Sequence, residues 1–227
     1  KIDSPTFFEP WLQFRQPIVR QLAFCIASPN ILTQIPDNLK IENYFELHPN
    51  TVWQEHYQAY EVRLQQLDQQ PRPLIDFMAR LKSTRLGLRF EHLLWFWLQD
   101  DDYHPYQLLG HSIQKIAGAV TLGELDFLLL NKQTQEIEHW EVALKYYLGE
   151  NELNLSEWFG LNRQDTLQRK LRHFTQRQFQ FSEANQYQIQ RKFAVMKGQL
   201  YLPKHHYASS IPAWINTSRR LGQWGTI

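Results

Sequence analysis

Three charged residues in two neighbouring apolar segments are the strongest candidates for chemistry in this sequence. Asp126 lies within residues 123–131, and Glu141 and Lys145 lie within residues 137–148. Both segments are rich in strand-forming residues. Two carboxylates supply the hard oxygen ligands that Mg²⁺ prefers, and a nearby lysine can stabilise negative charge on a phosphate or position an attacking water. These residue types point to metal-assisted cleavage of a phosphoester.

The spacing of the two segments predicts a β-hairpin that brings the three side chains together. A polar loop of four residues, Lys-Gln-Thr-Gln, separates the segments and has ordinary hairpin length. If Asn131 pairs with Glu136, the antiparallel register places Asp126 directly opposite Glu141. Side chains alternate between the faces of a strand, so Lys145 shares that face. The other face is expected to be buried and carries Leu125, Phe127, Val142, Leu144 and Tyr146.

Spacing alone leaves two interpretations of this charged face open. Facing carboxylates repel each other unless a cation lies between them, which favours a bound metal ion. Alternatively, Glu141 and Lys145 form a structural salt bridge with Asp126 as a third partner, because ion-pair networks mimic catalytic sites. The metal interpretation requires carboxyl oxygens of Asp126 and Glu141 to lie within about 5 Å, so that both reach one ion.

Glu91 is unusual because it lies on the apolar face of a predicted helix. Residues 74–99 have helical periodicity, with Ser83-Thr84 as the place for a break, and position 91 points where apolar side chains point. A buried carboxylate without a partner is costly. Glu91 therefore has either a catalytic role or a structural one, with Arg85 or Arg89 as its partner.

A basic segment follows the predicted hairpin. Residues 91–160 contain twelve acidic and three basic residues, whereas residues 163–192 contain seven basic and two acidic residues. An acidic centre beside a basic flank suits a metal site next to a polyanion, although two ordinary solvated surfaces give the same pattern. Residues 161–181 are predicted to form an amphipathic basic helix. Its candidates for nucleic-acid contact are Arg163, Gln168, Arg169, Lys170 and Arg172, with a solvated helix face as the alternative.

The elements that must position these residues predict an α/β fold. Residues 1–73 are expected to form an N-terminal helical extension packed on the core. Residues 74–202 are expected to form the core, in the order helix, three strands, helix, strand. Residues 203–227 are expected to form a C-terminal tail, and the three parts together one cooperative domain.

Composition places the chain among soluble intracellular proteins. It has 227 residues with 43% hydrophobic and 14% aromatic content, which argues against disorder. Cys25 is the only cysteine, which excludes an internal disulfide and a cysteine-based zinc cluster. No secretory signal is visible, and the apolar run around Cys25 is too short to span a membrane. We expect a cytoplasmic protein that does not insert into a membrane.

The predicted hairpin also resembles a known signature. Gly-Glu-Leu-Asp-Phe-Leu at 123–128, followed by Trp-Glu-Val-Ala-Leu-Lys at 140–145, is similar to the motif of the PD-(D/E)XK nuclease superfamily. The resemblance implies a restriction-endonuclease-like core, with Mg²⁺ held by Asp126 and Glu141 and with nucleic-acid phosphodiester bonds as the substrate. The wider sequence resembles an uncharacterised bacterial family of unknown function that is associated with this superfamily.

The resemblance extends to the helices and departs at the lysine. Glu91 matches the helix glutamate of the superfamily, which implies that it orients water or a second ion. Gln168 and Lys170 lie where the superfamily often adds a helix residue to the site. The superfamily usually has one residue between the acid and the lysine, but here that position is Ala143. Lys145 lies two residues further, about 6.6 Å along the strand.

Three outcomes follow from the displaced lysine. Lys145 spans the gap, Lys170 substitutes for it, or the site is catalytically silent. The sequence therefore predicts a Mg²⁺-dependent nuclease that acts on DNA or RNA. The alternatives are a nuclease-fold module that binds nucleic acid or a protein partner without cleavage, and a partner protein whose carboxylates are structural.

Overall fold

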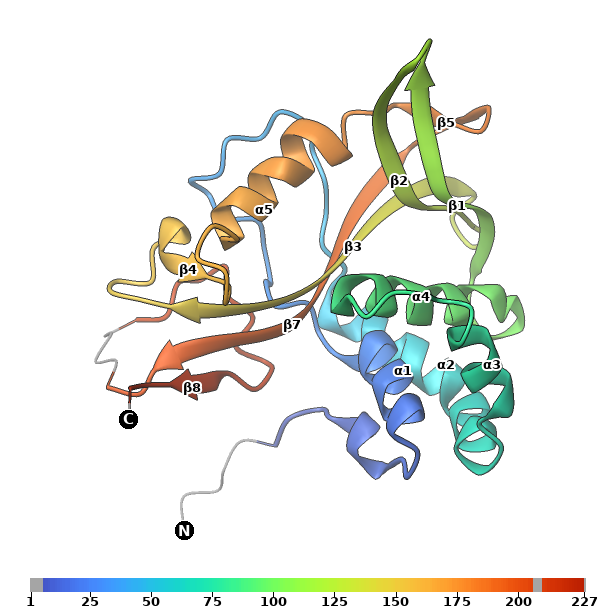
Figure 1. Ribbon diagram of the computed structural model, residues 1–227, viewed down its shortest axis with the longest axis horizontal. Coiled ribbons are helices and arrows are strands. Elements are labelled where there is room, and N and C mark those ends of the chain that lie inside the picture. Colours follow the sequence, from blue (N-terminus) through green and yellow to red (C-terminus); the bar gives the residue numbers. More distant parts are fainter. Residues whose placement is uncertain (1–5, 206–209, 227) are drawn as a thin grey trace.

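Helices form the first part of the chain and strands most of the second part in the computed structural model, which describes residues 6–205 and 210–226 (Figure 1). The helical elements before the sheet are η1 (Pro10–Gln13), α1 (Pro17–Ala27), α2 (Asn50–Gln69), α3 (Arg72–Met78), α4 (Leu86–Gln99) and η2 (Asp101–Tyr103). Pro17 is the first residue of α1, where the missing N–H group costs nothing. The stretch predicted to be helical over residues 74–99 is two helices, and the break over residues 79–85 includes Ser83 and Thr84, where an interruption was expected.

One mixed sheet of six strands follows the helices. Its strands are β1 (Tyr106–Ala117), β2 (Val120–Asn131), β3 (Glu136–Gly149), β4 (Trp158–Phe159), β7 (Arg191–Pro203) and β8 (Gly222–Trp224). The order is β1-β2-β3-β7-β8, and β4 pairs with β3. The first three strands are antiparallel, whereas β7 runs parallel to β3 and β8 parallel to β7. The predicted α/β class is confirmed, since α4, β1, β2, β3, α5 and β7 follow one another in the expected order.

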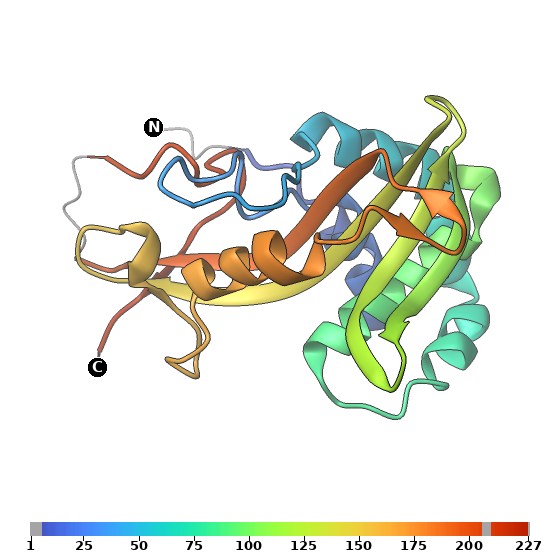
Figure 2. The ribbon, with the colours of Figure 1, turned by 90° about the horizontal axis from the view of Figure 1, so that it is seen from above.

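A crossover carries the chain from β3 to the parallel strand β7. It contains η3 (Leu155–Glu157), α5 (Leu167–His173), the π-helix η4 (Phe174–Gln178) and a separate hairpin of β5 (Glu183–Ala184) and β6 (Tyr187–Gln188). A parallel pair requires a long connection of this kind. Figure 2 shows α5 lying across β3.

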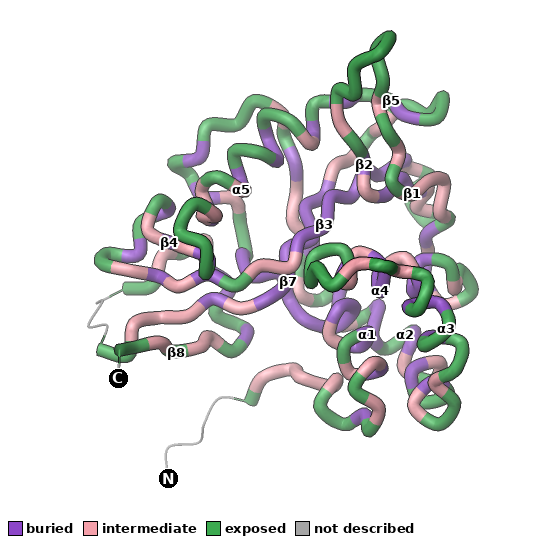
Figure 3. Tube along the Cα trace, in the orientation of Figure 1, coloured by how far each residue is buried: buried purple, intermediate pink, exposed green. Residues whose placement is uncertain are grey.

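The sheet has a helix layer on each face. On β3, Trp140 and Val142 belong to a core that includes α1, α2 and α4, whereas Ala143 and Tyr147 belong to a second core that includes α5. This division follows from the alternation of side chains along a strand. Buried residues are accordingly concentrated along the middle of β3 and β7 (Figure 3). The central strands are therefore covered on both sides.

The strands β2 and β3 pair over only part of their length. Their register runs from Asn131↔Glu136 to Phe127↔Trp140, which confirms the predicted pairing of Asn131 with Glu136. Beyond Phe127 the β1–β2 hairpin rises away from β3, while β3 continues beside β7 (Figure 1). The sheet therefore forks at the position where Asp126 and Glu141 face each other.

The predicted basic helix over residues 161–181 is wrong in extent. The α-helix begins only at Leu167, because the side chain of Thr166 accepts a hydrogen bond from the Arg169 N–H and caps the first turn. The preceding residues form a loop that contains Arg163. A π-helix replaces the α-helix after His173.

The final strand of the core runs without interruption through a glycine. The strand β7 begins at Arg191 and continues through Gly198 to Pro203. Gly198 pairs with Lys145 and has a φ of 125°, and a Cβ there would overlap the Lys145 carbonyl. The glycine therefore allows a close approach of two strands rather than a turn.

The N-terminal helices and the C-terminal segment both pack on the sheet. Residues of α1 and α2 share one hydrophobic core with α4, β3 and β7. In the C-terminal segment, Arg219 donates to the Pro29 carbonyl (2.8 Å) and Asn216 donates to the Asn30 carbonyl (2.9 Å). Residues 1–5 of the expected extension and residues 206–209 and 227 of the expected tail lie outside the described residues. No helix in the described ranges is long and apolar enough to cross a membrane.

Candidate active site

Asp126 and Glu141 lie in the fork between β2 and β3. At this position the two strands exchange main-chain to side-chain hydrogen bonds: the Val142 N–H donates to Asp126 Oδ2 (2.8 Å), and the Asp126 N–H donates to Glu141 Oε1 (3.4 Å). Each carboxylate thus accepts a hydrogen bond from the main chain of the other strand, and the charge of Glu141 acts on Asp126. The local splitting of the sheet therefore holds two acidic side chains against one another.

Glu141 is fully buried and both of its oxygens have protein partners. His139 Nε2 lies 2.6 Å from Glu141 Oε1, and Gln178 Nε2 donates to Glu141 Oε2. Burial lowers the pKa of His139 to about 3, so its ring is neutral at neutral pH. The other ring nitrogen, His139 Nδ1, is buried without a hydrogen-bond partner in the described part of the chain. Sequence reasoning missed His139, although its alternation with Glu141 places it on the same face of β3.

The environment of the acid pair disfavours two negative charges. Burial raises the pKa of Asp126 well above its ordinary value, and the charges of Glu141 and Glu91 add to this effect. Burial also raises the pKa of Glu141 to about 8, with Lys170 acting in the opposite direction. At neutral pH the pair therefore retains a proton unless a cation replaces it.

Lys170 approaches this pair from the crossover helix α5. Its Nζ donates to Gln178 Oε1 (3.0 Å) and lies over the ring of Phe174, 4.3 Å from the centroid. Burial lowers the pKa of Lys170, and the charges of Glu141 and Asp126 oppose that shift. The Gln178 amide thus bridges the lysine and Glu141.

Gln178 is held in place by the π-helix η4. Thr175, in the same helix, accepts hydrogen bonds from the main-chain N–H groups of Glu42 and Asn43 and donates to the Asn43 carbonyl (2.8 Å). These contacts anchor η4 to the loop between α1 and α2. Periodicity gives no signal for a π-helix, so the sequence did not point to Gln178.

Lys145 extends from the same strand but binds elsewhere. Its Nζ donates to Asp165 Oδ2 (2.8 Å), and Tyr147 donates to Asp165 Oδ1 (3.3 Å). The predicted salt bridge of Lys145 with Glu141 does not form. The interaction holds the loop that leads into α5, and Ala143 occupies the intervening position on β3.

Glu91 reaches the fork from α4 and pairs with a histidine of β1. Glu91 Oε1 lies 2.8 Å from His111 Nε2, and the His111 ring stacks between Trp95 and Phe127, with centroid distances of 4.1 and 4.9 Å. The charge of Glu91 contributes to the raised pKa values of the acid pair. Arg89, considered above as a structural partner, instead donates to Gln21 Oε1 (2.7 and 2.9 Å).

The carboxylates of Asp126 and Glu141 are the side chains of this site that could bind a hard cation. No group of three or more His, Cys, Asp or Glu side chains within the described residues is arranged to hold a metal ion. Mg²⁺, however, commonly binds one or two carboxylates and keeps several waters. A cation bound between Asp126 and Glu141 would stabilise their ionised forms and would therefore lower their raised pKa values.

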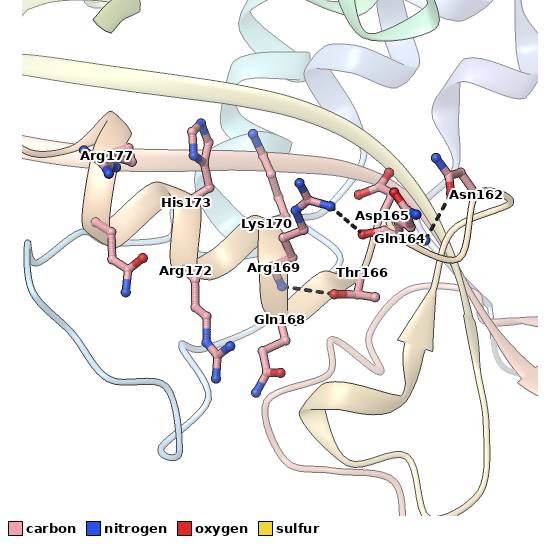
Figure 4. Close-up of a pocket in the computed structure, with 11 residues that line it drawn as sticks. Asn162, Gln164, Asp165, Thr166, Gln168, Arg169, Lys170, Arg172, His173 and Arg177 are labelled. Carbon is pink, nitrogen blue, oxygen red and sulfur yellow. Dashed lines mark hydrogen bonds between the residues drawn. The ribbon is translucent and has the colours of Figure 1, made fainter. Parts of the chain in front are cut away.

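A basic, open cavity of about 840 Å³ lies along α5 and the loop before it (Figure 4). Lys170 points towards the sheet, whereas Gln168 and Arg172 project to the opposite side of the helix. Arg169 donates to the Gln164 carbonyl (3.1 Å). Arg163 does not line this cavity and makes a two-point ion pair with Glu150 (2.6 and 3.1 Å).

Comparison with known proteins identifies a family and no activity. No curated protein and no solved structure matches the chain. A family model described as "Domain of unknown function (DUF1853)" matches residues 20–227, which is most of the chain. The protein therefore belongs to the DUF1853 family.

Proposed function

We propose that this protein is a Mg²⁺-dependent nuclease that hydrolyses phosphodiester bonds of DNA or RNA. The observation that carries the proposal is the fork: Asp126 and Glu141 face each other where two strands part, and Lys170 approaches both from the crossover helix. Two carboxylates and a desolvated lysine are the groups that this chemistry requires.

The element order supports placement in the PD-(D/E)XK superfamily. The helix α4, the antiparallel strands β1 to β3, the helix α5 and the strand β7 follow the order expected of that core. The acid pair occupies the hairpin positions that the sequence resemblance indicated. The protein departs from the superfamily pattern at the lysine. Lys145 forms an ion pair with Asp165, whereas Lys170 interacts electrostatically with Glu141 and Asp126.

The roles of the side chains follow from their contacts. Asp126 and Glu141 would hold Mg²⁺, which when bound polarises the scissile phosphate and lowers the pKa of a bound water. Lys170, partly desolvated, stabilises negative charge that develops on the phosphate. Glu91, fixed by His111, orients water at the mouth of the fork. The basic cavity along α5 holds the phosphate backbone.

A second candidate function is a nuclease-fold module that binds nucleic acid or a protein partner without cleaving. The observation that favours it is the complete satisfaction of Glu141 by His139 and Gln178. In that case the acid pair shares a proton permanently, and the fork is a structural feature. Metal binding distinguishes the two functions experimentally, because an acid pair that keeps its proton does not bind Mg²⁺ and the protein is then not stabilised by it.

The deciding experiment measures melting temperature with and without Mg²⁺ together with cleavage of single- and double-stranded substrates. The wild-type protein is expected to be stabilised by Mg²⁺ and to cleave. Asp126→Asn is expected to lose both properties and, without metal, to melt at the same or a higher temperature, because the amide replaces an acid whose ionisation is disfavoured by burial and by Glu141. A wild-type protein that neither cleaves nor gains stability from Mg²⁺, with an Asn variant that melts earlier, would refute the nuclease.

A further inference from the structure

A second cavity, of about 440 Å³, lies on the far side of the sheet between α1, α4 and the end of β3. Its wall is mainly apolar, with contributions from Trp11, Phe24, Leu86, Phe90, Leu93 and Leu144. Leu12 and Leu86, which also line it, are 66% and 59% exposed, and Tyr146 is 42% exposed. A concave apolar site of this volume is in the range that binds small molecules.

The polar groups at this cavity are mainly cationic. Two guanidinium groups, of Arg20 and Arg89, line it together with the amide of Gln21. Arg20 Nη1 donates to the main-chain carbonyls of Phe14 and Arg15 (both 2.9 Å), and Arg89 donates to Gln21. These contacts use only part of the five N–H groups that each guanidinium offers.

Neither arginine has an acidic partner among the residues that the structure describes. The ion pairs formed within residues 6–205 and 210–226 do not include Arg20 or Arg89. Burial raises the pKa of the Cys25 thiol at the wall of the cavity to about 12, and the charges that oppose this shift come from Lys197 and Arg89. The cavity therefore combines an apolar wall with two guanidinium groups that no described carboxylate neutralises.

We propose that this cavity binds a small amphipathic anion, a carboxylate with an apolar chain or ring. The apolar wall receives the body of the ligand, and the free N–H groups of Arg20 and Arg89 bind the carboxylate, which guanidinium groups match in geometry. A purely apolar occupant, such as a side chain of another protein or a second copy of this chain, leaves the two charges unpaired against an apolar surface. Charge complementarity therefore favours the anion.

Decanoate is a suitable probe, with decanol and decylammonium as neutral and cationic analogues of the same chain length. Isothermal titration calorimetry on the full chain is expected to show saturable binding in the order decanoate, decanol, decylammonium. The double variant Arg20→Met and Arg89→Met is expected to weaken decanoate binding by about tenfold or more, because charge-assisted hydrogen bonds are lost. The double variant is expected to leave decanol binding unchanged.

Two further variants locate the site. Leu144→Trp fills the cavity from β3 and is expected to abolish decanoate binding, whereas Arg85→Met removes an exposed arginine that does not line the cavity and is expected to bind as the wild type does. Equal affinity for decanoate and decanol, or unchanged binding in the Leu144→Trp variant, overturns the proposal. So does the absence of saturable binding, or concentration-dependent self-association that Leu12→Ala abolishes, since that identifies a second copy as the occupant.

Discussion

Replacing Glu141 with glutamine tests whether the acid pair retains a proton at neutral pH. The amide has nearly the size of a protonated carboxyl group and carries no charge, so it reproduces the protonated state at every pH. Glu141 is fully buried, and its pKa is about 8 against an ordinary 4.5. Between these values the folded protein keeps a proton that the unfolded chain releases.

The free energy of unfolding of the wild-type protein is expected to fall as the pH rises, because the folded-state pKa of Glu141 is raised. The stability that protonated Glu141 contributes is fully present below the unfolded pKa of 4.5 and is lost as the pH rises through about 8. Over this window the wild-type protein loses stability relative to Glu141→Gln, by up to about 1.4 kcal/mol per pH unit. From about pH 6 to about pH 8 the accumulated difference is about 2 kcal/mol, and above that it levels off.

Urea denaturation at several pH values without metal measures this difference. Subtracting the two proteins removes the contribution of groups that do not interact with Glu141, including the buried histidines outside the site, which titrate mainly at lower pH. Asp126 shares its proton with Glu141, so the difference reports on the acid pair. Glu124→Gln, an exposed carboxylate on β2, controls for the loss of one acidic group and is expected to show no such trend. A constant difference between wild type and Glu141→Gln across this pH range contradicts the raised pKa and the protonated pair.

Other perturbations address the remaining members of the site. Lys170→Met is expected to reduce Mg²⁺-dependent cleavage by about a hundredfold or more in single-turnover assays, because a group that stabilises developing charge is lost, whereas Lys145→Met retains most of the activity. Gln178→Ala frees an oxygen of Glu141, so Mg²⁺ is expected to bind more tightly in thermal-shift titrations, while stability without metal falls by about 1 kcal/mol. Arg172→Ala is expected to weaken nucleic-acid binding, measured by fluorescence anisotropy, and to lower the slope of log affinity against log salt concentration by about one phosphate contact. An unchanged slope would mean that the nucleic acid binds at another surface.

The hairpin was predictable because its information is local. The strand-forming segments, the polar loop and the alternation of faces fix the register within a few residues, so the approach of Asp126 to Glu141 follows from the sequence. The fork was not predictable. It depends on β2 turning to pair with β1 alone while β3 remains beside β7, which is a property of the whole sheet.

The contacts of Lys145 and Lys170 could not be predicted from the sequence around them. Alternation correctly puts Lys145 on the strand face of Glu141, but its partner Asp165 belongs to a loop that no periodicity describes. Lys170 and Gln178 reach the fork only because the crossover packs across β3, and Gln178 further requires a π-helix. Contacts between segments that are distant in sequence, rather than residue type, decided which lysine approaches the acids.

The crossover also determines when the site is completed during synthesis. A nascent chain contains Asp126 and Glu141 once β3 has been made, whereas Lys170 and Gln178 follow with α5 and η4. Pairing of β3 with β7 is non-local and requires closure of the whole crossover. Burial raises the pKa values of both carboxylates, and α5 and η4 contribute to the environment that surrounds them. Folding at neutral pH is therefore coupled to proton uptake by the acid pair.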